Sequence, residues 1–223
     1  MTETAPTAAP DALLLIAPGC PYCPTVLAAL GELVKSGAIA RLEVINLAQR
    51  SEIARSVGVR TVPWLRLGPF ELEGLRSLSE LKRWAERAGT KEGMADYFDE
   101  LLRDGKLEAV LELLARDPTQ LGALLHLIER PDTDLQVRVG VSAIMEEYEG
   151  HAALQDLVAR LGALTRHKNA HVRGDAAHYL SLTHDPRAVF CLQSLRHDPE
   201  RQVRELAAEG LAVLALKDTA PAG

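Results

Sequence analysis

Apolar positions in the first part of the chain alternate between strand-like and helix-like spacing. Residues 12–17 form a continuous apolar run ended by Pro18-Gly19, which is typical of a strand buried on both faces. Residues 23–35 then carry apolar side chains at steps of three and four, the spacing of a helix with one buried face. The same reasoning predicts five further elements: strand 41–46, helix 51–57, strand 60–67 interrupted by a proline, strand 70–73 and helix 77–88. The predicted order is β-α-β-α-β-β-α.

After about residue 93 the pattern predicts helices only, and a short motif recurs. A Val-Arg pair followed by small residues stands on a helix three times, at Val137-Arg138, Val172-Arg173 and Val203-Arg204. Residues 107–129 suit an earlier, degenerate helix pair, and residues 153–164 predict one helix between two of the motifs. Three Asp-Pro pairs place an N-cap acceptor before a first-turn proline: Asp117-Pro118, Asp185-Pro186 and Asp198-Pro199. An array of stacked helical units is therefore expected.

The charge of the chain is uneven and argues against nucleic acid as a partner. Residues 1–89 hold 10 Lys and Arg against 9 Asp and Glu, whereas the rest of the chain holds 15 against 22. No stripe of Lys and Arg that could replace phosphate counterions occurs. The N-terminus lacks the features of a secretory signal, and no apolar run approaches membrane-spanning length. We expect a cytoplasmic protein that binds neither nucleic acid nor membranes, with disordered ends over residues 1–10 and 217–223.

Two of the three cysteines, Cys20 and Cys23, stand where the first predicted strand meets the first predicted helix. Disulfide exchange needs an ionised, accessible thiol and a second thiol that resolves the mixed disulfide, and this spacing brings both to a helix start. The helix N-terminus favours the Cys20 thiolate, so Cys20 is the expected nucleophile and Cys23 the resolving cysteine. Metal or iron-sulfur ligation is the alternative, but zinc needs two more ligands, and Cys191 lies far along the chain in a segment that predicts a small buried side chain.

The motif Cys20-Pro-Tyr-Cys23 after an apolar strand, with Val59-Arg-Thr-Val-Pro63 about 40 residues later, resembles the glutaredoxin and thioredoxin superfamily. The resemblance covers residues 11–89. It implies a thioredoxin-like α/β fold of glutaredoxin type, in which Pro21 and Tyr22 complete the active-site motif.

The resemblance also assigns roles around the second motif. It implies a cis peptide bond before Pro63, placed beside the cysteine pair. Val62 and Pro63 would then contact substrate. Trp64 is open to two interpretations, since it could fill the core or contribute to the surface that receives substrate.

Departures from the superfamily argue against glutathione as a ligand. Dithiol glutaredoxins usually have a basic residue three positions before the first cysteine and a Gly-Gly followed by acidic residues late in the domain. Ala17 and residues 73–77 stand at those places here. Thioredoxins have a buried acid six positions before the first cysteine and a Trp directly before it, where this chain has Leu14 and Gly19.

The Val-Arg units resemble short HEAT repeats, in which small residues on the second helix let neighbouring helices approach. The resemblance implies an all-α repeat solenoid over residues 93–216 that follows the thioredoxin-like domain. Stacked repeats expose an extended surface, which suits a protein substrate or partner. The recurring arginines either pair with acids of adjacent repeats or form a row that faces a partner. We favour the first interpretation, because the arginines recur in step with the packing pattern.

Together these features predict a thiol-disulfide oxidoreductase that acts on a protein disulfide in cell redox homeostasis. It would need no cofactor and no metal, and its repeats would dock the protein substrate. The alternative is a non-catalytic adaptor in which both domains serve protein-protein interaction. His167 and His171 have the spacing of a chelating pair on one helix, but Lys168-Asn169 predicts a turn between them, so solvated turn histidines are expected.

Overall fold

The computed structural model describes residues 8–218, with side chains described to residue 215. It divides into two compact units, Met1–Met94 and Ala95–Gly223. The ends that were expected to be disordered fall mostly outside the described residues. Residues 8–10 and 217–218 are the exceptions: the Pro10 carbonyl accepts a hydrogen bond from Ala40 N–H, and residues 217 and 218 continue the last helix.

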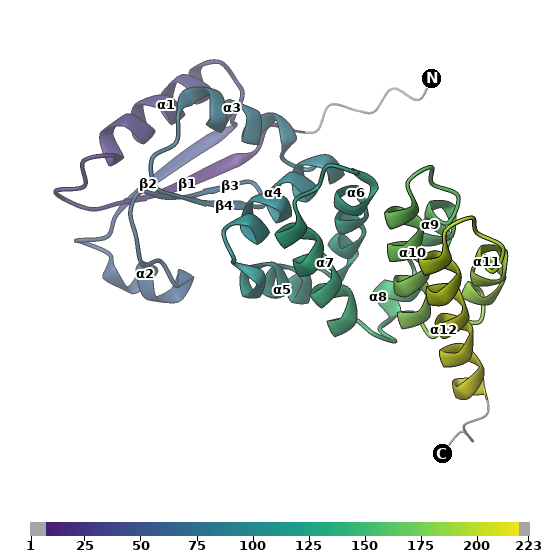
Figure 1. Ribbon diagram of the computed structural model, residues 1–223. Helices are drawn as coiled ribbons and strands as arrows, with labels where there is room; N and C mark the ends of the chain where they lie inside the picture. The colour runs from purple at the N-terminus through teal and green to yellow at the C-terminus, as the bar shows by residue number, and fades with distance from the viewer. Residues whose placement is uncertain (1–7, 219–223) are drawn as a thin grey trace. The chain divides into compact units, whose positions relative to one another are not determined.

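The first unit follows the predicted order of elements. They are β1 (Asp11–Ile16), α1 (Cys23–Lys35), β2 (Arg41–Asn46), α2 (Ser51–Val57), β3 (Trp64–Leu67), β4 (Phe70–Glu73) and α3 (Leu78–Arg87). The sheet order is β2-β1-β3-β4, with β1 parallel to β2 and β3 antiparallel to both of its neighbours. Helices α1 and α3 lie together over one face of the sheet, and α2 lies at the other (Figure 1). The third strand begins at Trp64 rather than at residue 60, because Pro63 has no N–H for the ladder.

The centre of the first unit is built on β1, the strand that leads to the cysteines. Leu14 and Leu15 are fully buried although they point to opposite faces, as the continuous apolar run predicted. Leu30 of α1 and Leu81 of α3 are fully buried as well. The helices and the two neighbouring strands therefore hold the end of β1 rigidly. The loop that leads from β1 to the cysteines begins at this fixed position.

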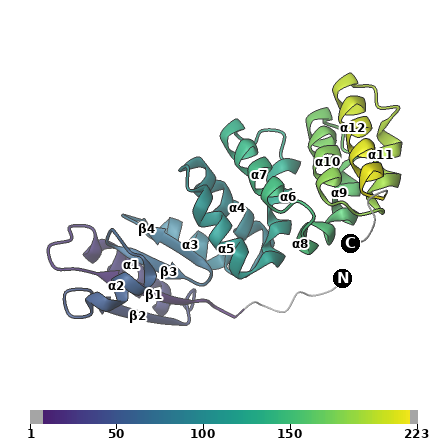
Figure 2. The ribbon, with the colours of Figure 1, turned by 90° about the horizontal axis from the view of Figure 1, so that it is seen from below.

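The second unit is helical throughout its described residues. Its elements are α4 (Lys91–Arg103, which begins in the first unit), α5 (Leu107–Arg116), the 3-10 helix η1 (Pro118–Ala123), α6 (Leu124–Glu129), α7 (Leu135–Glu147), α8 (Ala152–Gln155), α9 (Val158–Leu164), α10 (Ala170–Leu182), α11 (Ala188–Leu195) and α12 (Arg201–Asp218). The three helices that carry Val-Arg, α7, α10 and α12, pack side by side in one layer (Figure 2). Helices α9 and α11 pack against each other behind them. No helix in the part of the chain that the structure describes is long and apolar enough to cross a membrane.

Small residues in the repeats let helices approach, as the sequence pattern predicted. A Cβ added to Gly140 of α7 would meet Leu102 Cδ2 at 2.8 Å, so this glycine permits the close approach of α4.

Two predictions for the repeats were wrong. Asp117, Asp185 and Asp198 each accept a hydrogen bond from the backbone N–H two residues later, but only Asp117-Pro118 starts a helix, the 3-10 helix η1. Helices α11 and α12 begin two residues beyond Pro186 and Pro199, so Asp185 and Asp198 stabilise the turns that lead into these helices. The second error is that residues 153–164 are not one helix. They are broken between α8 and α9, where Leu157 donates to the Leu154 carbonyl in a 3-10 turn.

Candidate functional site

Cys20 and Cys23 lie at the mouth of α1 and are joined as a disulfide with their Cα atoms 5.6 Å apart. The chain leaves β1, turns at Gly19 with φ +77°, and enters α1 at Cys23. Cys23 is buried, whereas Cys20 is partly exposed. An incoming molecule can therefore reach the first sulfur and not the second, which is the arrangement that a nucleophile and a resolving thiol require.

The start of α1 is electrostatically suited to a sulfur anion. Tyr22, its N-cap residue, makes no side-chain capping bond. Instead the backbone N–H of Cys23 donates to Cys20 Sγ at 3.1 Å. Because the first N–H groups of a helix lack intrahelical acceptors and carry the positive end of its dipole, a thiolate at Cys20 would receive both effects. The two neighbours in the motif, Pro21 and Tyr22, are exposed, and 51% of the Tyr22 surface is accessible.

The second motif lies against the first. The Val62 carbonyl oxygen is 3.7 Å from Cys20 Sγ, and the Val62–Pro63 peptide bond is cis. Pro63 is anchored from the other side, since its carbonyl accepts a hydrogen bond from Gly74 N–H at 2.9 Å. Residues 42 positions apart in the chain thus form one surface around Cys20. Trp64 is only 3% exposed, which favours the core interpretation of this residue over substrate contact.

The departures noted in the sequence are visible around this site. Leu14 is fully buried in β1, so the strand that would carry the thioredoxin acid supplies no proton acceptor. Ala17 brings no cation to the loop before Cys20, and its carbonyl accepts the Cys20 N–H at 3.3 Å. The chemistry here is therefore limited to what the helix start, the paired sulfurs and the neighbouring backbone supply.

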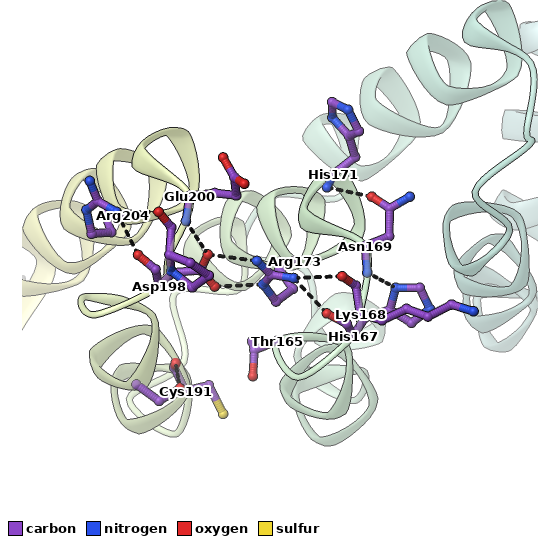
Figure 3. A network of polar contacts seen from close by, with 12 residues as sticks. Thr165, His167, Lys168, Asn169, His171, Arg173, Cys191, Asp198, Glu200 and Arg204 are labelled. Carbon is purple, nitrogen blue, oxygen red and sulfur yellow. Dashed lines mark hydrogen bonds and ion pairs between the residues drawn. The ribbon is translucent and has the colours of Figure 1, made fainter.

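Two of the three recurring arginines of the second unit, Arg138 and Arg173, tie repeats together, as the favoured interpretation predicted. Arg173 donates two hydrogen bonds to the Asp198 carboxylate, at 2.6 and 2.8 Å, and a third to the His167 carbonyl at 2.9 Å (Figure 3). Only 11% and 5% of the two charged side chains are exposed. Arg138 likewise pairs with Asp175 of the next Val-Arg helix at 2.5 Å. Each pair crosses from one repeat to the next.

These arginines also bind backbone carbonyls in the segment that precedes their own helix. Arg138 donates to the carbonyls of Ile128 and Arg130 at the end of α6, and Arg204 donates to those of Asp198 and Pro199 in the loop before α12. A guanidinium has enough N–H groups to serve several acceptors at once. Arg138 and Arg173 therefore each hold the connection within their own helix pair and also bind the next repeat. Sequence reasoning anticipated an acidic partner but could not identify Asp175.

Two further sequence predictions concern metal-ligating side chains. His167 lies in the loop before α10 and His171 lies within α10, so they are not on one helix, as expected. Cys191 is partly exposed rather than buried, which corrects the prediction, and it packs against Gly162 of α9. No group of three or more His, Cys, Asp or Glu side chains within the described residues could hold a metal ion.

The fold and the cysteine pair define a thioredoxin-like domain joined to helical repeats. Comparison with protein families agrees: residues 12–86 match the thioredoxin domain, and residues 123–212 match HEAT repeats. The comparison with curated proteins found no match. The chain is thus a fusion of a thioredoxin domain that carries a Cys-x-x-Cys pair with a HEAT-repeat array.

Proposed function

We propose that this protein is a thiol-disulfide oxidoreductase that acts on protein disulfides through Cys20 and Cys23. The observation that carries the proposal is the asymmetry of the pair: Cys20 is partly exposed and accepts a helix N–H, while Cys23 is 5% exposed behind it. An exposed sulfur with a lowered cost of ionisation is the one that attacks. A buried sulfur in reach of the first is the one that resolves.

The proposed reaction conserves electrons. In the reduced protein the Cys20 thiolate attacks one sulfur of a substrate disulfide, a mixed disulfide forms, and the other substrate sulfur leaves as a thiolate that takes up a proton. Cys23, after losing its proton to solvent, attacks Cys20 Sγ. The substrate leaves with two thiols, and the protein keeps the Cys20–Cys23 disulfide, which a dithiol donor reduces again. Because Leu14 replaces an acid, we expect deprotonation of Cys23 to be the slow step near neutral pH.

In this proposal the substrate is bound twice, by the surface around Cys20 and by the repeats. Tyr22, which is exposed, and Val62, which is partly exposed, border Cys20 and would contact the residues that flank the substrate cysteine, whereas Pro63 is buried and would support this surface from below. The repeats would hold the same protein elsewhere, which raises the concentration of its disulfide at Cys20. The absence of the usual glutathione contacts at Ala17 makes a protein the expected substrate.

An insulin-reduction assay with dithiothreitol tests the proposal. The native chain and Cys191→Ser, the matched control for a cysteine outside the pair, should reduce insulin at equal rates. Cys20→Ser should lower the rate to that of dithiothreitol alone. Reduced Cys23→Ser, mixed with insulin after dithiothreitol has been removed, should accumulate a mixed disulfide that added dithiothreitol releases. Alkylation of the reduced protein at varied pH should show Cys20 ionising below the free-thiol value of about 8.5.

A non-catalytic adaptor is the second candidate, and the buried Leu14 favours it, because this position lacks the acid that would activate Cys23. An adaptor would be silent in the insulin assay in all four forms, the native chain and the three cysteine variants. Equal activity of the native chain and Cys20→Ser would instead reject Cys20 as the nucleophile.

A further inference from the structure

Two adjoining hollows run across the layer of α7, α10 and α12. The first, of about 600 Å³, lies between α7 and α10, and the second, of about 290 Å³, lies between α10 and α12. His171 and Asp175 line both, so the hollows form one groove that spans three Val-Arg helices. We call this the α7–α12 groove. All of its lining residues belong to the second unit, and none belongs to the cysteine site.

Apolar side chains are exposed at one end of the α7–α12 groove. Leu135 is 75% exposed and Val139 is 61% exposed, although both stand on a well-formed helix whose buried face is made by Val137 and Val141. Covering aliphatic side chains of this size removes apolar surface from water and so stabilises a complex. Leu135 and Val139 therefore offer an anchor that this unit itself does not use.

The charged lining of the groove is acidic. Its carboxylates are Glu146, Asp175 and Glu200, and Arg138 is the one Lys or Arg among the lining residues described. Arg138 is already committed to Asp175 and to two backbone carbonyls, with 18% of its side chain exposed. It leaves little positive potential for an incoming anion. Glu146 and Glu200 are exposed, so the accessible charge along the groove is negative.

We propose that the α7–α12 groove binds a segment of a partner protein in which aliphatic side chains are flanked by Lys or Arg. The aliphatic side chains cover Leu135 and Val139, and the cations lie near Glu146 and Glu200. The charge complementarity selects against acidic segments, because they would meet carboxylates without a free cation. This inference rests on the docking role proposed above and gives that role a partner chemistry.

A labelled peptide of 16 residues, with leucines at helical steps of three and four and lysines elsewhere, tests the proposal by fluorescence anisotropy on the full chain. The Leu-Lys peptide should bind at least tenfold more tightly than a peptide with Glu in place of Lys, and tenfold more tightly than one with Ser in place of Leu. Leu135→Ser combined with Val139→Ser, and Glu146→Lys combined with Glu200→Lys, should each weaken binding at least fivefold. These side chains are exposed, so the variants keep the core.

Matched controls separate the groove from general acidity. Phe190→Ser removes a side chain of 74% exposure on α11 outside the groove, and Glu108→Lys reverses an exposed charge on α5. Both should bind like the native chain. Equal affinity for all three peptides, or equal loss in groove and control variants, overturns the proposal. Cys20→Ser should not change the affinity, and the groove variants should reduce insulin normally, so failure of this inference is distinguishable from failure of the proposed redox function.

Discussion

The two units of this chain place their functional groups in different ways. In the thioredoxin domain, the candidate chemistry depends on two sulfurs at one helix start, and the surrounding residues serve to present one and bury the other. In the repeats, no single side chain would carry the proposed docking role. The surface arises because three equivalent helices stand side by side and leave apolar and acidic side chains along their shared face. A point change can therefore abolish the first function, whereas the second should decline stepwise.

The same contrast applies to stability. The thioredoxin domain is held by apolar residues of β1 and its neighbours, whereas the second unit adds polar pairs that cross from one repeat to the next. Both tryptophans, Trp64 and Trp84, lie in the first unit. Tryptophan fluorescence therefore follows unfolding of the first unit, and far-UV circular dichroism is dominated by the helices of the second.

The largest expected effect on stability is the loss of Arg173. Arg173→Met leaves the buried Asp198 carboxylate without its partner and should lower the free energy of unfolding of the repeats by about 3–5 kcal/mol. Urea unfolding, monitored by circular dichroism, measures this loss of stability. Arg201→Met is the control, since the Arg201–Glu205 pair has a similar distance of 2.7 Å but exposed side chains, and its loss should change the stability far less. Equal costs would show that the buried pair does not hold the repeats together.

A cavity in the first unit should have the next largest effect. Leu14→Ala removes a fully buried side chain and should cost about 2–5 kcal/mol in unfolding followed by tryptophan fluorescence. Val44→Ala on β2 is the control, because Val44 is the register partner of Leu14 but is 40% exposed. The circular dichroism transition of the repeats should stay in place if the units unfold independently. A joint shift of both transitions would show that the two units do not unfold independently.

The cap of α3 tests a smaller, local contribution. Ser77 accepts the Glu80 N–H, and the Glu80 carboxylate accepts the Ser77 N–H in return. Ser77→Ala should cost about 1 kcal/mol, again read by tryptophan fluorescence because Trp84 lies in this helix. Ser56 lies within α2 and has no capping role, so Ser56→Ala should leave the free energy of unfolding nearly unchanged. A similar cost for both would indicate that the capping box contributes nothing.

The smallest expected effect is a pH dependence of the repeats. Hydrogen bonds from Arg173 lower the pKa of Asp198 below its usual value, so the stability it contributes is present above about pH 4 and is lost as the pH falls through the lower folded-state pKa. Burial raises the pKa of Asp175, so its contribution has the opposite sign and favours the fold at low pH. In urea titrations between pH 3 and 6, the free energy of unfolding should fall less steeply with decreasing pH in Asp198→Asn than in the native chain. It should fall more steeply in Asp175→Asn. Identical pH profiles for both variants would contradict these signs.

Much of the architecture follows from local sequence. The order of strands and helices in the first unit can be predicted because each element has a distinct apolar period and ends at Gly, Pro or a cap. Cys20 and Cys23 can be singled out because their spacing, at the start of a predicted helix, favours a disulfide pair. The Val-Arg repeats can be predicted because the same motif recurs three times in a region where only helices are expected. Leu135 and Val139 could have been noticed too, because apolar residues at every second position of a helix cannot all face one core.

Other features depend on which distant residues meet, and only the tertiary structure decides that. Local period does not say that Trp64 is buried, that Cys191 is partly exposed, or that Arg138 pairs with Asp175 rather than with another acid. Nor does it place His171 and Asp175 at the junction of two hollows. Burial, pairing and grooves are properties of surfaces that come together from separate segments, whereas helices, strands and motifs are properties of neighbouring residues along the chain.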